Sequence, residues 1–289
     1  MPDIAPRRVA ARLFACAALA CSGAARAGDL DFIDMFRNVG FMQTGNGNSL
    51  VDNGAFFTTL VFTLGGVAYS GGSVSFAAAL SPVALTPGPG NTYGYESAAF
   101  ASKGAMDAAF PQGSYSYTLL SAGPPAQSSF SLGADQFALS RPYLSGTSYA
   151  ALQGAQAAAP LALSFSPYTV NPAASEALMF FTVYDYTAAQ FVFDAGFLAA
   201  NTAGLVLPGG LLQAGHQYAY ELIYSSRVRV PSSNTNFDSQ IGFELRTTGQ
   251  FATAVPEPAA WGLMLSGLSV LAWRRRCAGL QVPKQPQLA

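Results

Sequence analysis

The fold is decided by residues 177–248, where four apolar runs follow one another: ALMFFTVYDY at Ala177–Tyr186, QFVFDAGFL at Gln190–Leu198, HQYAYELIY at His216–Tyr224 and QIGFELRTT at Gln240–Thr248. Each run is short and rich in aromatic and branched side chains, which favour strands. In the third run Tyr218, Tyr220 and Leu222 alternate with Ala219, Glu221 and Ile223. This period of two predicts strands rather than helices.

The same pattern continues upstream, where runs at 55–64, 114–120 and 161–165 are separated by Gly, Pro, Asn and Ser. Gly71 and Gly72 predict a hairpin turn between strands at 67–69 and 73–80. The Pro- and Gly-rich stretch at 86–91 predicts a loop. Two Ala-rich stretches predict short helices at 98–110 and 149–159, the second with Ser148 as its N-cap.

Many short strands with little helix predict a mainly β protein, an antiparallel β-sandwich or jelly-roll-like ectodomain. We divide it into a β-rich region at 28–139 and a β-sandwich region at 140–254. A boundary near residues 133–140 leaves open whether these form one domain or two.

The charge balance and the positions of the cysteines exclude some classes of function. Acidic residues outnumber basic ones between residues 28 and 254. Because no basic stripe occurs, nucleic-acid binding is not expected. The three cysteines lie near the two ends of the chain, at Cys16, Cys21 and Cys277. We therefore expect a body without disulfides or thiolate metal sites.

The body contains few of the residues and motifs that are typical of enzymes. Its one histidine is His216, and no HExxH, GxSxG or phosphate-loop pattern is present. We expect no catalytic residue, no metal site and no cofactor. Glycoside hydrolysis needs only two converging carboxylates, and strand residues could supply them: Asp185, Asp194, Glu221 and Glu244. The alternative is that these face solvent. A calcium site near Asp29–Asp34 or Asn46–Asn53 is a further alternative to ordinary turns.

Aromatic pairs at period two recur along the chain. Exposed, they would offer stacking surfaces for sugar rings; buried, they would form one face of a core. Tyr93 and Tyr95 are the candidate glycan contacts, because they follow a Pro-Gly loop.

The N-terminal 27 residues predict a secretory signal peptide. Arg7, Arg8 and Arg12 precede an apolar stretch at 13–22, and the pattern Ala25-Arg26-Ala27 predicts cleavage before Gly28. A lipoprotein signal ending at Cys21 is the competing interpretation.

Near the other end, Pro256-Glu257-Pro258 precedes an apolar segment at 259–273 and the cluster Arg274-Arg275-Arg276. As a helix this segment would span roughly 22 Å, against a hydrocarbon core of about 30 Å. It predicts a short transmembrane helix whose arginines stay cytoplasmic, with 277–289 as a polar cytoplasmic tail. An ordinary single-span anchor is the alternative.

This stretch resembles the PEP-CTERM sorting signal over residues 255–276. The resemblance rests on Pro256, Glu257 and Pro258, on Trp261, and on the basic stop at Arg274, Arg275 and Arg276. One departure is the tail at 277–289, because such signals usually end near the arginines.

The resemblance implies export by a Gram-negative bacterium through the secretion translocon, a transient hold in the inner membrane and cleavage by an exosortase-type protease. It also implies a link to exopolysaccharide and biofilm. We therefore predict a non-enzymatic, exported cell-surface or extracellular-matrix protein. A carbohydrate-binding module is the first alternative, and a secreted glycosidase is the second.

Overall fold

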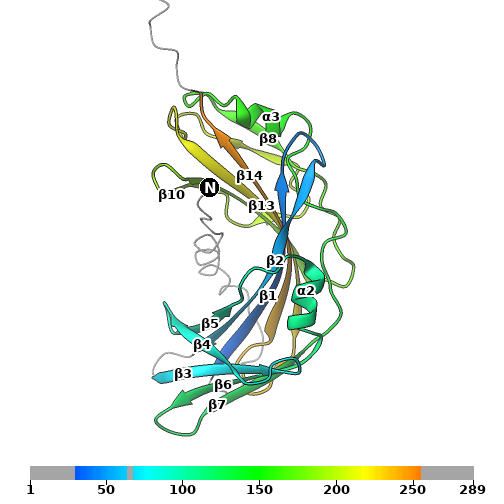
Figure 1. Ribbon diagram of the computed structural model, residues 1–289, viewed down its shortest axis with the longest axis vertical. Coiled ribbons are helices and arrows are strands. Elements are labelled where there is room, and N and C mark those ends of the chain that lie inside the picture. The colour runs from blue at the N-terminus through cyan, green and yellow to red at the C-terminus, as the bar shows by residue number, and fades with distance from the viewer. Residues whose placement is uncertain (1–29, 64–67, 255–289) are drawn as a thin grey trace, which may run out of the picture.

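The computed structural model describes residues 30–63 and 68–254, and it is mainly β, as predicted. Figure 1 shows a crescent of long strands with short helices on its convex side. The helices are α2 (Lys103–Ala109) and α3 (Ser148–Gln153). The strands are β1 (Leu30–Gln43), β2 (Leu50–Thr63), β3 (Tyr69–Phe76), β4 (Val83–Gly88), β5 (Thr92–Glu96), β6 (Gly113–Ser121), β7 (Ala126–Leu132), β8 (Leu161–Ser164), β9 (Glu176–Asp185), β10 (Gln190–Asp194), β11 (Leu198–Ala199), β12 (Gly204–Leu207), β13 (Gln217–Val230) and β14 (Ser239–Ala252).

One large sheet runs through the described residues in the order β10-β9-β13-β14-β1-β2-β5-β4-β3-β6-β7, with β11 paired to β9. A separate pair, β12-β8, covers part of it. The sheet joins strands from both predicted regions, because β14 is hydrogen-bonded to β1. The division at residues 139 and 140 stays a prediction.

The sheet is mixed, which corrects the expectation of a purely antiparallel one. β1 runs parallel to β14, with Asp34 opposite Gln240 and Met42 opposite Thr248. β13 pairs antiparallel with both β14 and β9. A parallel pair needs a long connection, and here nearly the whole body lies between the two strands. The first and last described strands therefore lie together at the centre of the sheet.

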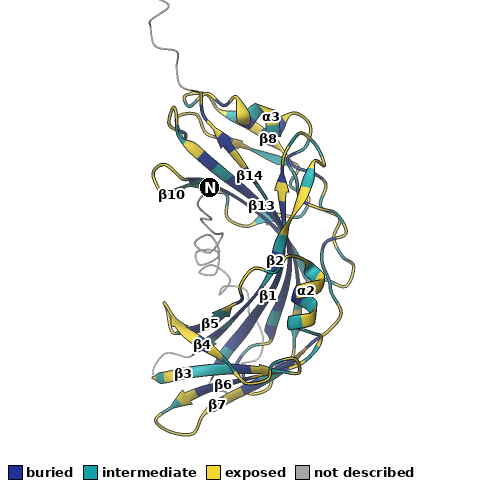
Figure 2. Ribbon diagram, in the orientation of Figure 1, coloured by how far each residue is buried: buried dark blue, intermediate teal, exposed yellow. Residues whose placement is uncertain are grey.

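The hydrophobic core lies on one face of the central strands and has two parts. In the lower half, β3, β6 and β7 fold over β1, β2 and β14, burying residues such as Ile33, Phe57 and Tyr117. In the upper half, α3, β8 and β12 cover β9, β13 and β14 and bury Phe181 and Tyr220. Figure 2 shows the central strands buried along most of their length and the hairpin tips exposed.

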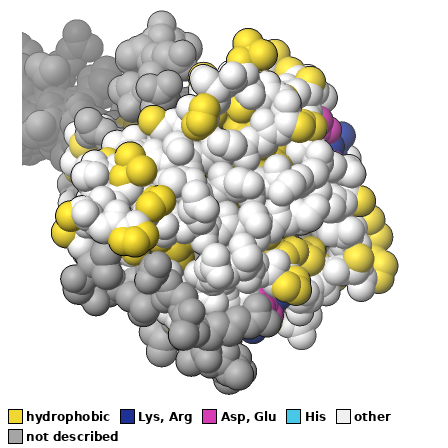
Figure 3. Space-filling view, turned by 90° about the horizontal axis from the view of Figure 1, so that it is seen from below, with side chains coloured by type: hydrophobic (Ala, Val, Ile, Leu, Met, Phe, Trp, Pro, Cys, Tyr) yellow, Lys and Arg dark blue, Asp and Glu magenta, His cyan; other side chains and the backbone are white. Residues whose placement is uncertain are grey.

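Seen from below, the surface of the lower half carries few charged side chains (Figure 3). Scattered apolar side chains lie among uncharged polar groups and backbone, without one continuous apolar patch. Such scattering is ordinary for a soluble surface.

Several local predictions are wrong. β3 is a single strand that runs through Gly71 and Gly72, so there is no hairpin turn there. Gly72 is used instead for close packing, because an added Cβ would lie 2.2 Å from the Leu119 side chain. The predicted loop at 86–91 belongs partly to β4, which includes Pro87. Pro87 is opposite Tyr93 of β5 in the ladder.

The two helices are shorter than predicted. α2 begins after Ser102, whose hydroxyl accepts a hydrogen bond from the Ala105 backbone amide. In α3 the N-cap residue is Thr147, and Ser148 is the first helical residue. The Ser148 hydroxyl accepts instead from the Ser164 amide at 2.8 Å, which ties α3 to β8.

Candidate functional site

The predicted sorting and cleavage residues lie outside the described residues. These are Ala25, Ala27, Gly28, Pro256, Glu257, Pro258, Trp261, Arg274, Arg275 and Arg276. The last central strand, β14, ends at Ala252, a few residues before Pro256. Among the residues that the structure describes, no helix has the length and apolar character needed to cross a membrane. The expected helix at 259–273 is outside that range.

Tyr93 does not lie exposed on the surface, which corrects that expectation. It is 9% exposed and belongs to the lower core. Its hydroxyl donates to the Tyr69 carbonyl at 2.7 Å, and the two rings meet edge to face. Tyr95 is partly buried against Phe110. Both rings point into the core because residues 93 and 95 share the core-facing side of β5.

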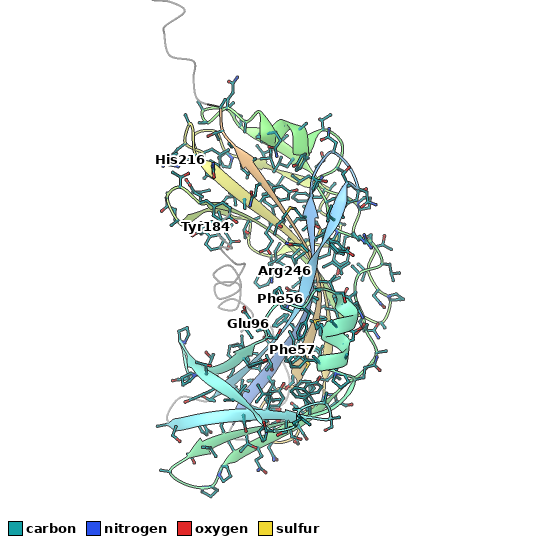
Figure 4. All side chains as sticks on the ribbon, in the orientation of Figure 1. Phe56, Phe57, Glu96, Tyr184, His216 and Arg246 are labelled. Atoms are coloured by element: carbon teal, nitrogen blue, oxygen red, sulfur yellow. The ribbon has the colours of Figure 1, made fainter. Side chains whose placement is uncertain are left out.

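The four candidate carboxylates occupy three different places. Asp185 is buried and lies 2.8 Å from His216 Nδ1. Asp194 accepts from the Gly196 amide at 2.8 Å and is exposed. Glu221 and Glu244 lie on neighbouring strands at the centre of the sheet, both buried. Figure 4 shows His216 near the upper end of the sheet, well away from the central Arg246.

The sheet gathers charged side chains on its concave face, opposite to the two cores. We call Asp34, Glu221, Arg227, Glu244 and Arg246 the concave-face charge cluster. They come from β1, β13 and β14, which are adjacent. Ladder register aligns Ser225 with Glu244 and Glu244 with Asn38, so alternate residues of three strands share this face. Figure 4 shows Arg246 and Glu96 on the concave side.

Arg246 is the centre of the cluster. Its Nε donates to Glu221 Oε1 and its Nη2 to Glu221 Oε2, both at 2.9 Å, and Nη1 donates to Asn38 at 3.3 Å. Its guanidinium also lies 5.3 Å from the Phe56 ring centroid. Burial works to lower the pKa of Arg246, but Glu221 and Glu244 more than offset this, so the pKa is raised. The arginine is therefore fixed and charged.

Arg227 is surrounded by aromatic rings. Its guanidinium carbon lies 5.7 to 5.9 Å from the centroids of Phe36, Phe180 and Phe197. Its Nε donates to the Ser225 hydroxyl at 3.3 Å, and that hydroxyl donates to Glu244 at 3.4 Å. Arg227 is thus held by cation–π contacts and by a hydroxyl relay to a carboxylate.

Asp34 is the least satisfied member of the cluster. It is 1% exposed, and its Oδ2 has no hydrogen-bond partner. Burial raises the pKa of Asp34 to about 7; Arg227 lowers it in part and Glu244 adds to the rise. Burial likewise raises the pKa of Glu244, against the opposing effect of Arg246 and Arg227. Carboxylates and arginines here satisfy one another except at Asp34.

The cluster therefore has the character of a structural charge network. A metal role has no support among residues 30–63 and 68–254, where no group of three or more His, Cys, Asp and Glu is placed to hold an ion. Sequence reasoning singled out Glu221 and Glu244 as candidate carboxylates and Asp34 only as a possible calcium ligand, and it missed Arg227 and Arg246. The alternation in Glu244-Leu245-Arg246 is the signal that places the two charges on one face.

Comparisons with solved structures give weak likenesses. A biofilm associated protein, BSP domain, is 12% identical, with 79% of this chain and 30% of that chain covered and a TM-score of 0.21. The FN1–FN3 domains of chicken CNTN1 are 8% identical, with 80% and 68% covered and a TM-score of 0.22. The chain spans about 30% of the biofilm-associated protein that it matches. TM-scores this low support no inference about the fold or function of this chain.

No curated protein sequence matches the chain. A family model does match its C-terminal part, at residues 254–276, and that model describes the PEP-CTERM protein-sorting motif. The match contains the Pro-Glu-Pro sequence, the apolar segment and the three arginines. The chain therefore carries a PEP-CTERM protein-sorting motif, which implies export and processing by the membrane protease exosortase.

Proposed function

We propose that this protein is a non-enzymatic β-sheet protein of the cell surface or extracellular matrix, released from the inner membrane by cleavage at its sorting motif and linked to exopolysaccharide or biofilm. The observation that carries the proposal is the sorting motif at residues 254–276, directly after the last strand of the sheet. Because β14 ends at Ala252, the body and the cleavage signal are joined by very few residues.

The engagement of the polar side chains supports a non-enzymatic role. A glycosidase needs two carboxylates facing each other across a substrate cleft. Glu221 accepts hydrogen bonds from Nε and Nη2 of Arg246, and Asp185 is bound by His216. Each of these two carboxylates therefore already has a structural partner. The burial of Tyr93 also removes one of the two candidate glycan contacts.

Mass spectrometry of the secreted protein tests the proposal. We expect the wild-type protein to lack the residues beyond its cleavage point, and a triple substitution of Pro256, Glu257 and Pro258 by Ala to keep them and remain in the membrane fraction. Lys284→Ala, in the predicted tail, is the control and should be processed normally. A secreted wild-type protein that is intact through Ala289 would contradict the proposal.

A further inference from the structure

A polar pocket lies on the convex side of the sheet, away from the concave-face charge cluster. It has a volume of about 450 Å³ and is lined mainly by Asn48, Ser140, Arg141, Tyr143, Ser166 and Thr169. A second pocket of about 370 Å³ shares Ser140 and Arg141 with it and continues past Phe137 to Lys103. Both volumes are within the usual range of roughly 300–1,000 Å³ for ligand sites. We call the first one the Arg141 pocket.

The walls of the Arg141 pocket are held by a frame of hydrogen bonds between residues 139–145 and 164–169. The Ser166 hydroxyl donates to the Arg141 carbonyl at 3.0 Å and accepts from the Tyr143 amide at 3.0 Å. The Ser140 hydroxyl donates to the Pro167 carbonyl at 2.8 Å and accepts from the Thr169 amide at 2.7 Å. These two serines fix the backbone on both sides of the pocket, so the site is formed before any ligand arrives.

Arg141 differs from the arginines of the charge cluster. Its guanidinium carbon lies 4.7 Å from the centroid of the Phe41 ring, which lines the adjoining pocket, and this cation–π contact holds the guanidinium in place. Within the described part of the chain no carboxylate is paired with it, whereas Arg227 pairs with Glu176 and Arg246 with Glu221. Arg141 is exposed. A fixed guanidinium without an acidic partner is a ready receptor for an external carboxylate.

Three further side chains in the pocket have unused hydrogen-bonding groups. The Asn48 amide, the Tyr143 hydroxyl and the Thr169 hydroxyl make no hydrogen bond to other described residues. Asn48 and Thr169 are exposed, and Tyr143 is half-buried. Amide and hydroxyl groups of this kind pair readily with alcohols, because each can both donate and accept. No acidic side chain lines the Arg141 pocket itself.

We propose that the Arg141 pocket binds a carboxylated sugar, a hexuronate-type unit of an anionic polysaccharide. Arg141 takes the carboxylate, and Asn48, Tyr143 and Thr169 pair with ring hydroxyls. We place the carboxylate in the Arg141 pocket because no acidic side chain lines it, whereas Asp52 lines the adjoining pocket. The adjoining pocket, with Phe137 and Leu139, suits a neighbouring sugar unit of the same polymer.

The proposal names a ligand for the exported protein, but its test is independent of sorting. Full-length purified protein is run in affinity electrophoresis through gels containing polygalacturonate, neutral dextran or polyglutamate. We expect polygalacturonate alone to retard the wild-type protein. Because acidic residues outnumber basic ones in the body, general attraction to polyanions is weak, and retardation reports a specific site.

Arg141→Gln should weaken binding to polygalacturonate about tenfold or more, as expected for loss of a charge-assisted pair. Arg229→Gln, an equal charge change at another exposed arginine, should change it less than about twofold. Tyr143→Phe keeps the ring and should weaken binding several-fold. Equal losses in the Arg141 and Arg229 variants, equal retardation by polyglutamate, or no retardation of the wild type would each overturn the proposal.

Discussion

Arg246 and Glu221 form a two-pronged ion pair across neighbouring strands β14 and β13, with Nε–Oε1 and Nη2–Oε2 both at 2.9 Å. The side chains are 6% and 8% exposed. The pair is therefore removed from water, and its energetic role differs from that of a surface salt bridge.

Removing one partner of this pair should strongly destabilise the protein. Arg246→Met leaves the Glu221 carboxylate buried without its guanidinium, which costs about 3–5 kcal/mol in the free energy of unfolding. The double variant Glu221→Leu with Arg246→Met should recover a large part of that loss. Urea unfolding of the two single variants and the double variant measures the coupling. Strictly additive losses would show that the pair does not act as a unit.

Asp34 should make stability depend on pH in the sense opposite to a salt-bridged acid. Its folded-state pKa is raised from 3.8 to about 7, so between these values the folded protein binds more protons than the unfolded chain. The contribution of Asp34 therefore becomes less favourable as pH rises from about 4 to about 7. The Asp34→Asn side chain cannot ionise. The free energy of unfolding of this variant, relative to the wild type, should therefore rise by at least about 1 kcal/mol from pH 4 to pH 8. Unfolding curves of both proteins at pH 4 and pH 8 measure this. The same stability difference between variant and wild type at both pH values would contradict the prediction.

A side chain at position 242 should destabilise the protein. A Cβ there would lie 2.4 Å from the Phe36 ring, which packs over the glycine on the concave face. Gly242→Ala should cost about 1–3 kcal/mol of stability, as overpacking does. Gly133→Ala is the matched control, because a Cβ at that position meets nothing within 4 Å. Thermal unfolding compares the two; equal melting temperatures would show that the Phe36 ring moves aside freely.

Substitutions of two basic residues that pair with the same acids should have very different effects on the free energy of unfolding. Arg37 and Lys103 both pair with Asp107 and Asp135, but their side chains are 2% and 37% exposed. Arg37→Gln should destabilise by about 1–3 kcal/mol, because it removes a buried cation that makes charge-assisted hydrogen bonds to partly exposed acids. Lys103→Gln should cost less than about 1 kcal/mol, as for an exposed pair. Urea unfolding checks both, and a larger loss at Lys103 would contradict the role of burial.

The central strand β1 shows where sequence reasoning stops. Its residues Leu30–Gln43 were not predicted as a strand, because Asp31, Asp34, Arg37 and Asn38 interrupt the apolar pattern. Arg37 and Asn38 are buried together with partners from distant parts of the chain. Asp107 and Asp135 reach Arg37, and Arg246 reaches Asn38. The sequence of residues 30–43 does not indicate which distant residues will pair with these side chains.

The sequence alone determined the β class, the strands β9, β10, β13 and β14 within residues 176–252, and the sorting motif at 254–276. These follow from local signals: a two-residue period, turn residues and a short ordered motif. Only the tertiary structure decided that β1 pairs parallel with β14, that Tyr93 is buried, and that Arg246 binds Glu221 while Arg141 stays unpaired by the described acids. The physical reason is that pairing and burial depend on residues far apart in the chain, which are brought together only when the sheet forms.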